Sequence, residues 1–147
     1  MFKFILSVIL VVFSYSFSFA GKIAFIDMQK VLNESVAGKE IQNTLNKKVE
    51  KLKKEIERKQ AAGESQQALQ KFMMEKQREL NKLRQQLADK FMKVLESAIK
   101  DFSKRYGYDL ILDKTPIIYG NKSLNKTAEF LNFFNNYYKR HKWKKDL

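Results

Sequence analysis

Apolar residues recur every three or four positions through the middle of the chain. This pattern predicts a long helical hairpin between about Gly38 and Tyr106. The first half of the hairpin carries one apolar stripe, formed by Ile41, Leu45, Val49, Leu52 and Ile56. Lysines and glutamates occupy its other faces, as in a narrow, coiled-coil-like seam. The stripe fades afterwards, and residues 61–65 (AAGES) are where we expect the chain to reverse.

The second half of the hairpin is longer. Its apolar positions are Leu69, Phe72, Met73, Leu80, Leu83, Leu87, Phe91, Val94, Ala98 and Phe102. Several of these repeat every eleven residues, which is typical of nearly straight packing at about 3.67 residues per turn. At ~1.5 Å per residue, the roughly forty residues 66–105 extend ~60 Å, and Gly107 suits the position after the helix end. So long an arm predicts self-association, a partner, or both.

Short apolar runs on either side of the hairpin predict strands. They cover residues 22–27, 108–113 and 117–119. Pro116 begins the third run, where its missing amide does least harm, so the last two strands are expected to form a hairpin.

Two further helices are predicted beside these strands. Asp27 can cap a short helix over Met28–Glu34, and Gly38 is the expected bend into the arm. A last helix is expected from Asn125 or Thr127 to Tyr138. Its packed side consists of Phe130, Leu131, Phe134 and Tyr138.

These elements predict an α+β fold with a small β-rich head and a long antiparallel helical arm. The head comprises residues 21–37 and 107–138, the arm residues 38–106, and a basic tail residues 139–147. One protomer would have a very small core, so we expect the heads of several protomers to pack together. The candidate interface residues are Ile23, Phe25, Leu110, Leu112, Ile117 and Ile118.

The first twenty residues have the pattern of a secretory signal peptide. Lys3 precedes an apolar run over residues 4–13, and Ser18 and Ala20 place small residues before a cleavage site after Ala20. This predicts a soluble, exported protein whose mature chain begins at Gly21. The sequence contains no cysteine, so stability must come from packing or oligomerisation, and thiol chemistry and zinc–thiolate sites are excluded.

The formal net charge of +13 suggests acidic partners. Export makes nucleic acid an unfavoured partner and favours anionic lipid, lipopolysaccharide or a newly exported polypeptide. Residues 39–104 carry 17 basic and 10 acidic side chains, a surplus of seven. Such a surplus can attract acidic unfolded chains, although a charged helix face is often simply solvated.

Catalysis is not predicted. The single histidine, His141, lies among cations in the tail, and Asp27, Asp109 and Asp113 at strand ends are explained by capping and solvation. No phosphate-binding glycine loop, nucleophile motif or metal-ligand spacing is present, and no cofactor is expected.

The strand sequences around the hairpin resemble those of a known family. KIAFIDM (residues 22–28), DLILD (109–113), IIY (117–119) and NKTAEFL (125–131), in this order around a charged hairpin, are similar to the Skp/OmpH family of periplasmic chaperones. The resemblance implies a jellyfish-shaped homotrimer whose arms enclose unfolded outer-membrane proteins without ATP and pass them on for insertion. The basic extension over residues 139–147 and the short arm tip depart from the family's pattern.

A holding chaperone needs adaptable apolar side chains, and methionine suits irregular surfaces. The client-binding candidates are Met74, Leu69, Phe72, Met73, Lys53, Lys54 and Lys82. Among them, Phe72 and Met73 are expected to pack inside the hairpin, whereas Met74 lies off the stripe. The alternative is a coiled-coil adaptor of the cell envelope, tethered to anionic surfaces by a basic tail in which Trp143 would be an interfacial anchor.

Overall fold

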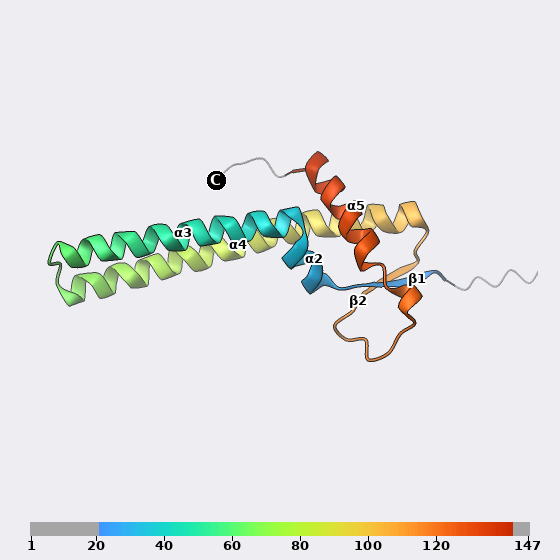
Figure 1. Cartoon of the computed structure of the whole chain (residues 1–147), viewed down its shortest axis with the longest axis horizontal. Helices are drawn as coiled ribbons and strands as arrows, with labels where there is room; N and C mark the ends of the chain where they lie inside the picture. Colours follow the sequence, from blue (N-terminus) through green and yellow to red (C-terminus); the bar gives the residue numbers. More distant parts are fainter. Residues whose placement is uncertain (1–20, 143–147) are drawn as a thin grey trace, which may run out of the picture.

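The computed structural model describes residues 21–142, so the predicted signal peptide and residues 143–147 of the tail lie outside it. The elements in chain order are strand β1 (Ile23–Ile26), helix α2 (Met28–Glu34), helix α3 (Val36–Ala61), helix α4 (Gln66–Tyr106), strand β2 (Leu110–Asp113), the short 3₁₀ helix η1 (Lys122–Leu124) and helix α5 (Thr127–Arg140). A long arm extends from a head that contains both strands (Figure 1).

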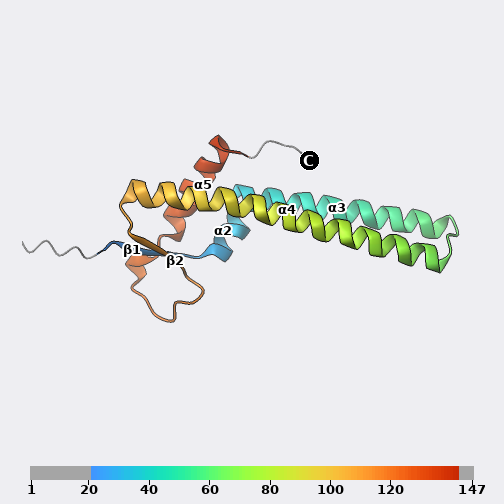
Figure 2. The ribbon, with the colours of Figure 1, turned by 180° about the vertical axis from the view of Figure 1, so that it is seen from behind.

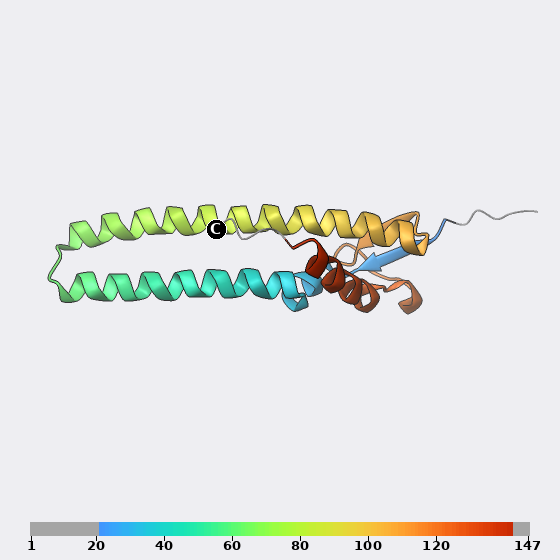
Figure 3. The same cartoon turned by 90° about the horizontal axis from the view of Figure 1, so that it is seen from above.

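The arm is the antiparallel helical hairpin that the apolar spacing predicted. Helices α3 and α4 lie side by side along its length (Figure 3). The reversal also lies where it was predicted, because α3 ends at Ala61 and Ser65 caps α4 by accepting a hydrogen bond from the Ala68 amide (3.3 Å). Gly107 ends α4 with a left-handed φ of 69°. Helix α4 continues past the start of α3 into the head (Figure 2), so one helix belongs to both parts.

The bend into the arm lies at Ser35, and the prediction of Gly38 as the bend is wrong. The Ser35 hydroxyl oxygen accepts a hydrogen bond from the Gly38 amide (3.0 Å), which starts α3 directly after α2. Gly38 is buried within the first turn of α3. A side chain there would overlap the carbonyl group of Leu32 in α2. The glycine therefore permits two helices to approach closely, which is a different role from that of a flexible bend.

Helix α5 supplies most of an aromatic core that is larger than the sequence suggested. Phe102 of α4 lies with its ring 5.2 Å from that of Phe130 and 5.3 Å from that of Phe133, and Phe91 meets Phe134 at 5.7 Å. Leu131 was predicted on the packed side of α5, whereas the burial of Leu95, Phe133 and Tyr137 was not predicted. Because α5 crosses α4 at an angle (Figure 1), its packed side is centred on phenylalanine and tyrosine, and Leu131 is only half-buried.

The described residues form two strands, which pair in parallel, and the predicted third strand is wrong. Ile23 lies opposite Leu110, and Phe25 opposite Leu112. Residues 117–119 belong to a loop, because the Ile117 amide donates to the Lys114 carbonyl (2.9 Å) and closes a turn around Pro116. The free edge of β1 is also occupied at Phe25, whose carbonyl accepts from the Lys126 amide (3.0 Å).

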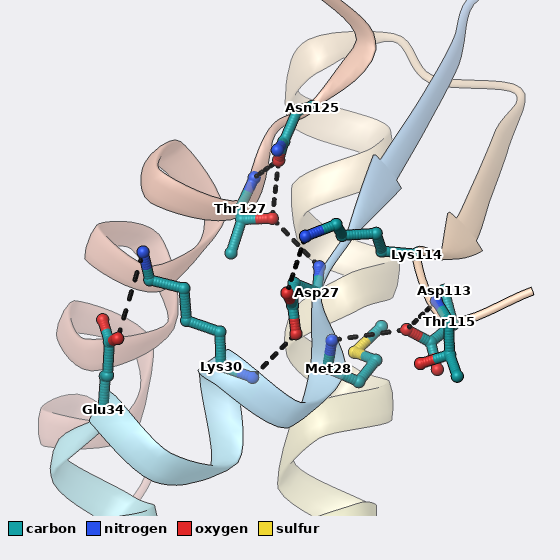
Figure 4. A network of polar contacts seen from close by, with 9 residues as sticks. All are labelled: Asp27, Met28, Lys30, Glu34, Asp113, Lys114, Thr115, Asn125 and Thr127. Atoms are coloured by element: carbon teal, nitrogen blue, oxygen red, sulfur yellow. Dashed lines mark hydrogen bonds and ion pairs between the residues drawn. The ribbon is translucent and has the colours of Figure 1, made fainter. Parts of the chain in front are cut away.

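A polar network joins β1, α2, the loop after β2 and the start of α5 (Figure 4). Asp27 caps α2 as predicted, since its carboxylate accepts from the Lys30 amide (2.9 Å), and it also pairs with Lys114 (3.2 Å). The Asp27 amide donates to the Thr127 hydroxyl (2.9 Å). The hydrogen bond from the Lys30 amide is the main reason why the pKa of Asp27 is lowered, and Lys114 lowers it further. The network thus fixes the head around one ionised carboxylate.

A second polar cluster holds the root of the arm against α5. The Glu40 carboxylate of α3 accepts hydrogen bonds from the Tyr138 hydroxyl (2.7 Å) and the Lys142 ammonium group (2.7 Å). The Asn135 side chain accepts from the Val36 amide (2.9 Å), at the first turn of α3. Burial first, and then the Glu40 contact, raise the pKa of Tyr138. Contacts from α5 and from Lys142, just after it, therefore hold the start of the arm in place.

Candidate functional site

The arm has two unlike faces. On one face, an ion pair crosses between the helices, because Lys48 of α3 lies 3.6 Å from Glu79 of α4. Within α4, Lys76 lies 2.6 Å from the same carboxylate. The Lys76 hydrogen bond is the main reason why the pKa of Glu79 is lowered. Two ammonium groups lie over the Phe72 ring, those of Lys59 (4.8 Å) and Lys76 (5.6 Å). We call this the bridged face.

The opposite face carries an apolar groove at mid-arm, of about 520 Å³. Its lining comprises Val49, Leu52, Ile56 and Leu80, with Lys53, Glu57, Gln60 and Gln77 at the edges. Each residue turns about 100° around a helix, so Val49 and Lys53 lie on one side of the seam and Lys48 on the other. No salt bridge between described residues spans this groove, so its apolar floor is open to contact.

A second groove, of about 550 Å³, lies at the root of the arm. Its lining comprises Met28, Leu32, Ile41, Leu45, Ala88, Phe91, Met92, Leu95 and Ile99, with Gln29, Arg84, Glu96, Asp113 and Thr115 at the edges. On α4, Gln77 of the first groove is followed at helical spacing by Arg84, Ala88 and Met92 of the second. The two grooves therefore follow one another along one side of the hairpin, which we call the open face.

The predicted client-binding residues are distributed unevenly. Met74 is 54 % exposed, as its position off the stripe predicted. Phe72 is half-buried in the hairpin, but Met73 is 45 % exposed, so the prediction that Met73 packs inside is wrong. No residue between 61 and 79 is fully buried, so the hairpin covers its apolar stripe only partly near the tip.

The remaining candidates are half-buried Leu69 and three exposed lysines. Lys53 lies at the edge of the mid-arm groove, whereas Lys54 and Lys82 line neither groove. Sequence reasoning missed Met92, which is 49 % exposed and lines the root groove. It lies eighteen residues after Met74, which is five helical turns, and that spacing could have indicated a shared face.

The head carries an exposed apolar surface on one side of the sheet. In the parallel register, Ile23, Leu110 and Leu112 share this side, and all three are exposed. Phe25 shares the side but is buried. Ile117 is half-buried, and Ile118 and Tyr119 are almost fully exposed. Ile23, Leu110 and Leu112 thus form an exposed apolar surface on the sheet, and Ile118 is an exposed apolar side chain in the loop after β2.

A basic hollow of about 380 Å³ lies where the last turns of α4 and α5 meet. It is lined by Asp101, Lys104, Arg105, Phe133, Arg140 and His141. Among the described residues, the three cations of the lining form no salt bridge. The His141 ring stacks on Tyr137 at 4.2 Å between ring centres. This hollow, which sequence reasoning missed, is suited to anions.

Metal binding finds no support between residues 21 and 142, where no group of three or more histidine or acidic side chains could hold an ion. In the same part of the chain, no helix is both long and apolar enough to span a membrane. The geometry therefore offers contact surfaces: grooves, an open sheet face and a basic hollow.

A comparison with protein families agrees with this architecture. Residues 22–65 and 58–133 match the model of a family described as outer membrane protein (OmpH-like), and the two overlapping matches cover the whole arm and most of the head. A search of curated proteins found no match. The matched family is the Skp/OmpH family of periplasmic chaperones for outer-membrane proteins, and the chain belongs to it.

Proposed function

We propose that this chain is an ATP-independent holding chaperone of the periplasm that binds unfolded outer-membrane proteins after export, prevents their aggregation and delivers them for insertion. The observation that carries this proposal is the open face of the arm, with two successive apolar grooves. Unfolded segments present apolar side chains without fixed geometry, and shallow grooves can accept many of them weakly. The absence of metal-ligand and nucleophile motifs from the sequence favours a binding role.

The charge of the arm supports capture of acidic clients. A surplus of seven positive charges over residues 39–104 attracts an acidic polypeptide and raises its association rate. Lys53 brings one of these charges to the edge of a groove. Because the Debye length is about 8 Å at physiological ionic strength, the association rate should fall as salt is added, while the apolar contacts persist.

A homotrimer completes the proposal. The exposed sheet residues Ile23, Leu110 and Leu112, together with Ile118, form an apolar surface that a second copy could cover. Three arms that project from such a shared head would enclose a space into which their open faces could turn. Export through a cleaved signal peptide would place this assembly in the periplasm.

The test is native mass spectrometry of residues 21–147, alone and with a urea-unfolded outer-membrane barrel diluted to low denaturant. We expect a trimer that takes up one unfolded client and does not take up the same barrel once it is folded. The double variant Val49→Gln, Met92→Gln, with one change in each groove, should capture less client. Lys54→Gln with Lys82→Gln, also on the arm but outside both grooves, is the matched control. A monomer or dimer that ignores the client would contradict the proposal.

The second candidate is an envelope adaptor tethered to anionic surfaces, and the basic hollow favours it. Lys104, Arg105 and Arg140 converge there, close to the start of the basic tail. Each basic residue near an anionic membrane contributes about 1 kcal/mol of binding. Sedimentation with phosphatidylglycerol vesicles should show binding that the triple glutamine variant of these residues loses. The control is the triple variant Lys47→Gln, Lys51→Gln, Lys54→Gln, which loses the same charge from the arm. If it binds the vesicles as well as wild type does, the hollow and not the total charge is responsible.

A further inference from the structure

The methionines of this chain are placed unusually. Methionine is commonly buried, yet three of the four described methionines are about half exposed: Met73 (45 %), Met74 (54 %) and Met92 (49 %). All three belong to α4 and to the arm. The fourth, Met28, is partly buried and packs against the core. The whole sequence has no cysteine, so these thioethers are the arm's only sulfur atoms.

Met92 belongs to the open face, Met74 lies on the same side of α4, and Met73 lines neither groove. Met92 lines the root groove, and Met74 lines a shallow hollow near the tip with Ala68 and Lys71. The eighteen residues between Met74 and Met92 make five turns, so both side chains lie on the same side of α4. The mid-arm groove, with Leu80 on its floor, lies between them along the open face.

We propose that Met73, Met74 and Met92 are oxidation sites through which a two-electron oxidant of the hypochlorous acid class lowers client holding by this arm. The inference rests on the proposed function, because it describes how binding at the open face is regulated. Methionine sulfoxide formation is reversible by reductases, so the change is a switch between an apolar and a polar arm.

The chemistry is complete with the thioether, the oxidant and water. The sulfur lone pair attacks chlorine and displaces hydroxide, which gives a chlorosulfonium group. Water then adds to sulfur, loses its two protons and expels chloride. One proton neutralises the hydroxide, so each sulfur gains one oxygen, and chlorine is reduced to chloride with release of one proton. The protein supplies only exposure of the sulfur atom.

The physical effect follows from the added oxygen. A sulfoxide is a strong hydrogen-bond acceptor, and covering it with an apolar client segment without a donor opposes binding. The fold should survive, because the aromatic core around Phe102 contains none of the three residues. Oxidation should therefore change binding at the open face while the helices and the head remain intact.

The experiment treats the full exported chain with a limiting amount of hypochlorous acid and stops the reaction with free methionine. Peptide mass spectrometry then measures oxidation at each methionine, and circular dichroism measures helix content. We expect the three arm methionines to be oxidised before Met28, with unchanged helix content. Client binding should weaken roughly tenfold, because the client would cover sulfoxide oxygens that have no hydrogen-bond donor. Treatment with a methionine sulfoxide reductase should restore the binding.

Two variants make the test specific. The triple variant Met73→Leu, Met74→Leu, Met92→Leu keeps the apolar area and should hold the client after oxidant treatment. The Met28→Leu control should remain sensitive. If oxidised wild type holds client as well as the reduced chain, or if the triple variant is inactivated equally, the inference is wrong. If the reduced chain holds no client, the proposed function fails instead, and the oxidation pattern still reports whether the arm methionines are the reactive sites.

Discussion

Replacing Gly38 by alanine tests whether helix packing outweighs helix propensity in the arm. In an exposed helix position, glycine to alanine stabilises by about 1 kcal/mol. At Gly38, the added Cβ would overlap the backbone of α2 and lie 2.8 Å from the Leu32 carbonyl carbon and 3.2 Å from the Ser35 hydroxyl oxygen. Overpacking typically costs about 1–3 kcal/mol of stability. The upper end of this range applies, because the group that the Cβ meets is backbone, which cannot move aside as a flexible side chain can. The expected net loss is about 2 kcal/mol.

Urea unfolding followed by far-ultraviolet circular dichroism, at one fixed protein concentration, measures this change. Asn43→Ala, at an exposed position of the same helix, is the control and should stabilise by about 0.5 kcal/mol. A Gly38→Ala variant with a higher urea midpoint than wild type would refute the packing argument. Because Leu32 of α2 also lines the root groove, displacement of α2 should in addition weaken client binding there.

Three further predictions concern the core, the cap and the bridged face. Phe102→Ala should lower the free energy of unfolding by about 3–5 kcal/mol, whereas Phe72→Ala, at the half-buried tip, should lower it by about 1 kcal/mol. Urea unfolding measures both changes, and equal losses would contradict the prediction. Asp27→Asn keeps the cap but removes the charge. Because the pKa of Asp27 is lowered from 3.8, its stabilisation is present above that pH and is lost as the pH falls through the folded-state pKa. The stability gap between wild type and Asp27→Asn should therefore close in acid, and a constant gap would contradict the charge argument. Glu79→Gln should speed amide exchange at mid-arm in low salt only, since screening already weakens the pairs in high salt.

Local signals in the sequence were sufficient for the helices and for most of their ends, although not for the start of α3 at Val36. The apolar spacing predicted both arm helices, and residues 61–65 were identified as the reversal. Asp27 and Gly107 were assigned their capping roles, which depend only on a side chain or φ angle and the next few amides. These features need no knowledge of distant residues, which is why one sequence is enough to predict them.

The errors have different origins. The run at 117–119 has the composition of a strand, but the hydrogen bond from the Ile117 amide to the Lys114 carbonyl closes a turn around Pro116, and the run joins no sheet. Met73 follows the apolar stripe, but the stripe is only partly covered near the tip, where no residue between 61 and 79 is fully buried. Phe133 and Tyr137 lie at helical spacing from Phe130, Phe134 and Tyr138, so the periodicity of α5 could have indicated them.

For the candidate site, the sequence identified the exposed Met74 and the basic charge of the arm. It did not identify which side of the hairpin is open. Sequence alone determined the arm, its caps and its charge, because helix period and capping are local properties of the chain. The tertiary structure decided which side of the hairpin is closed by Lys48, Lys76 and Glu79 and which side is open. That choice depends on how two helices are rotated against each other, and contacts between residues about thirty positions apart fix this rotation.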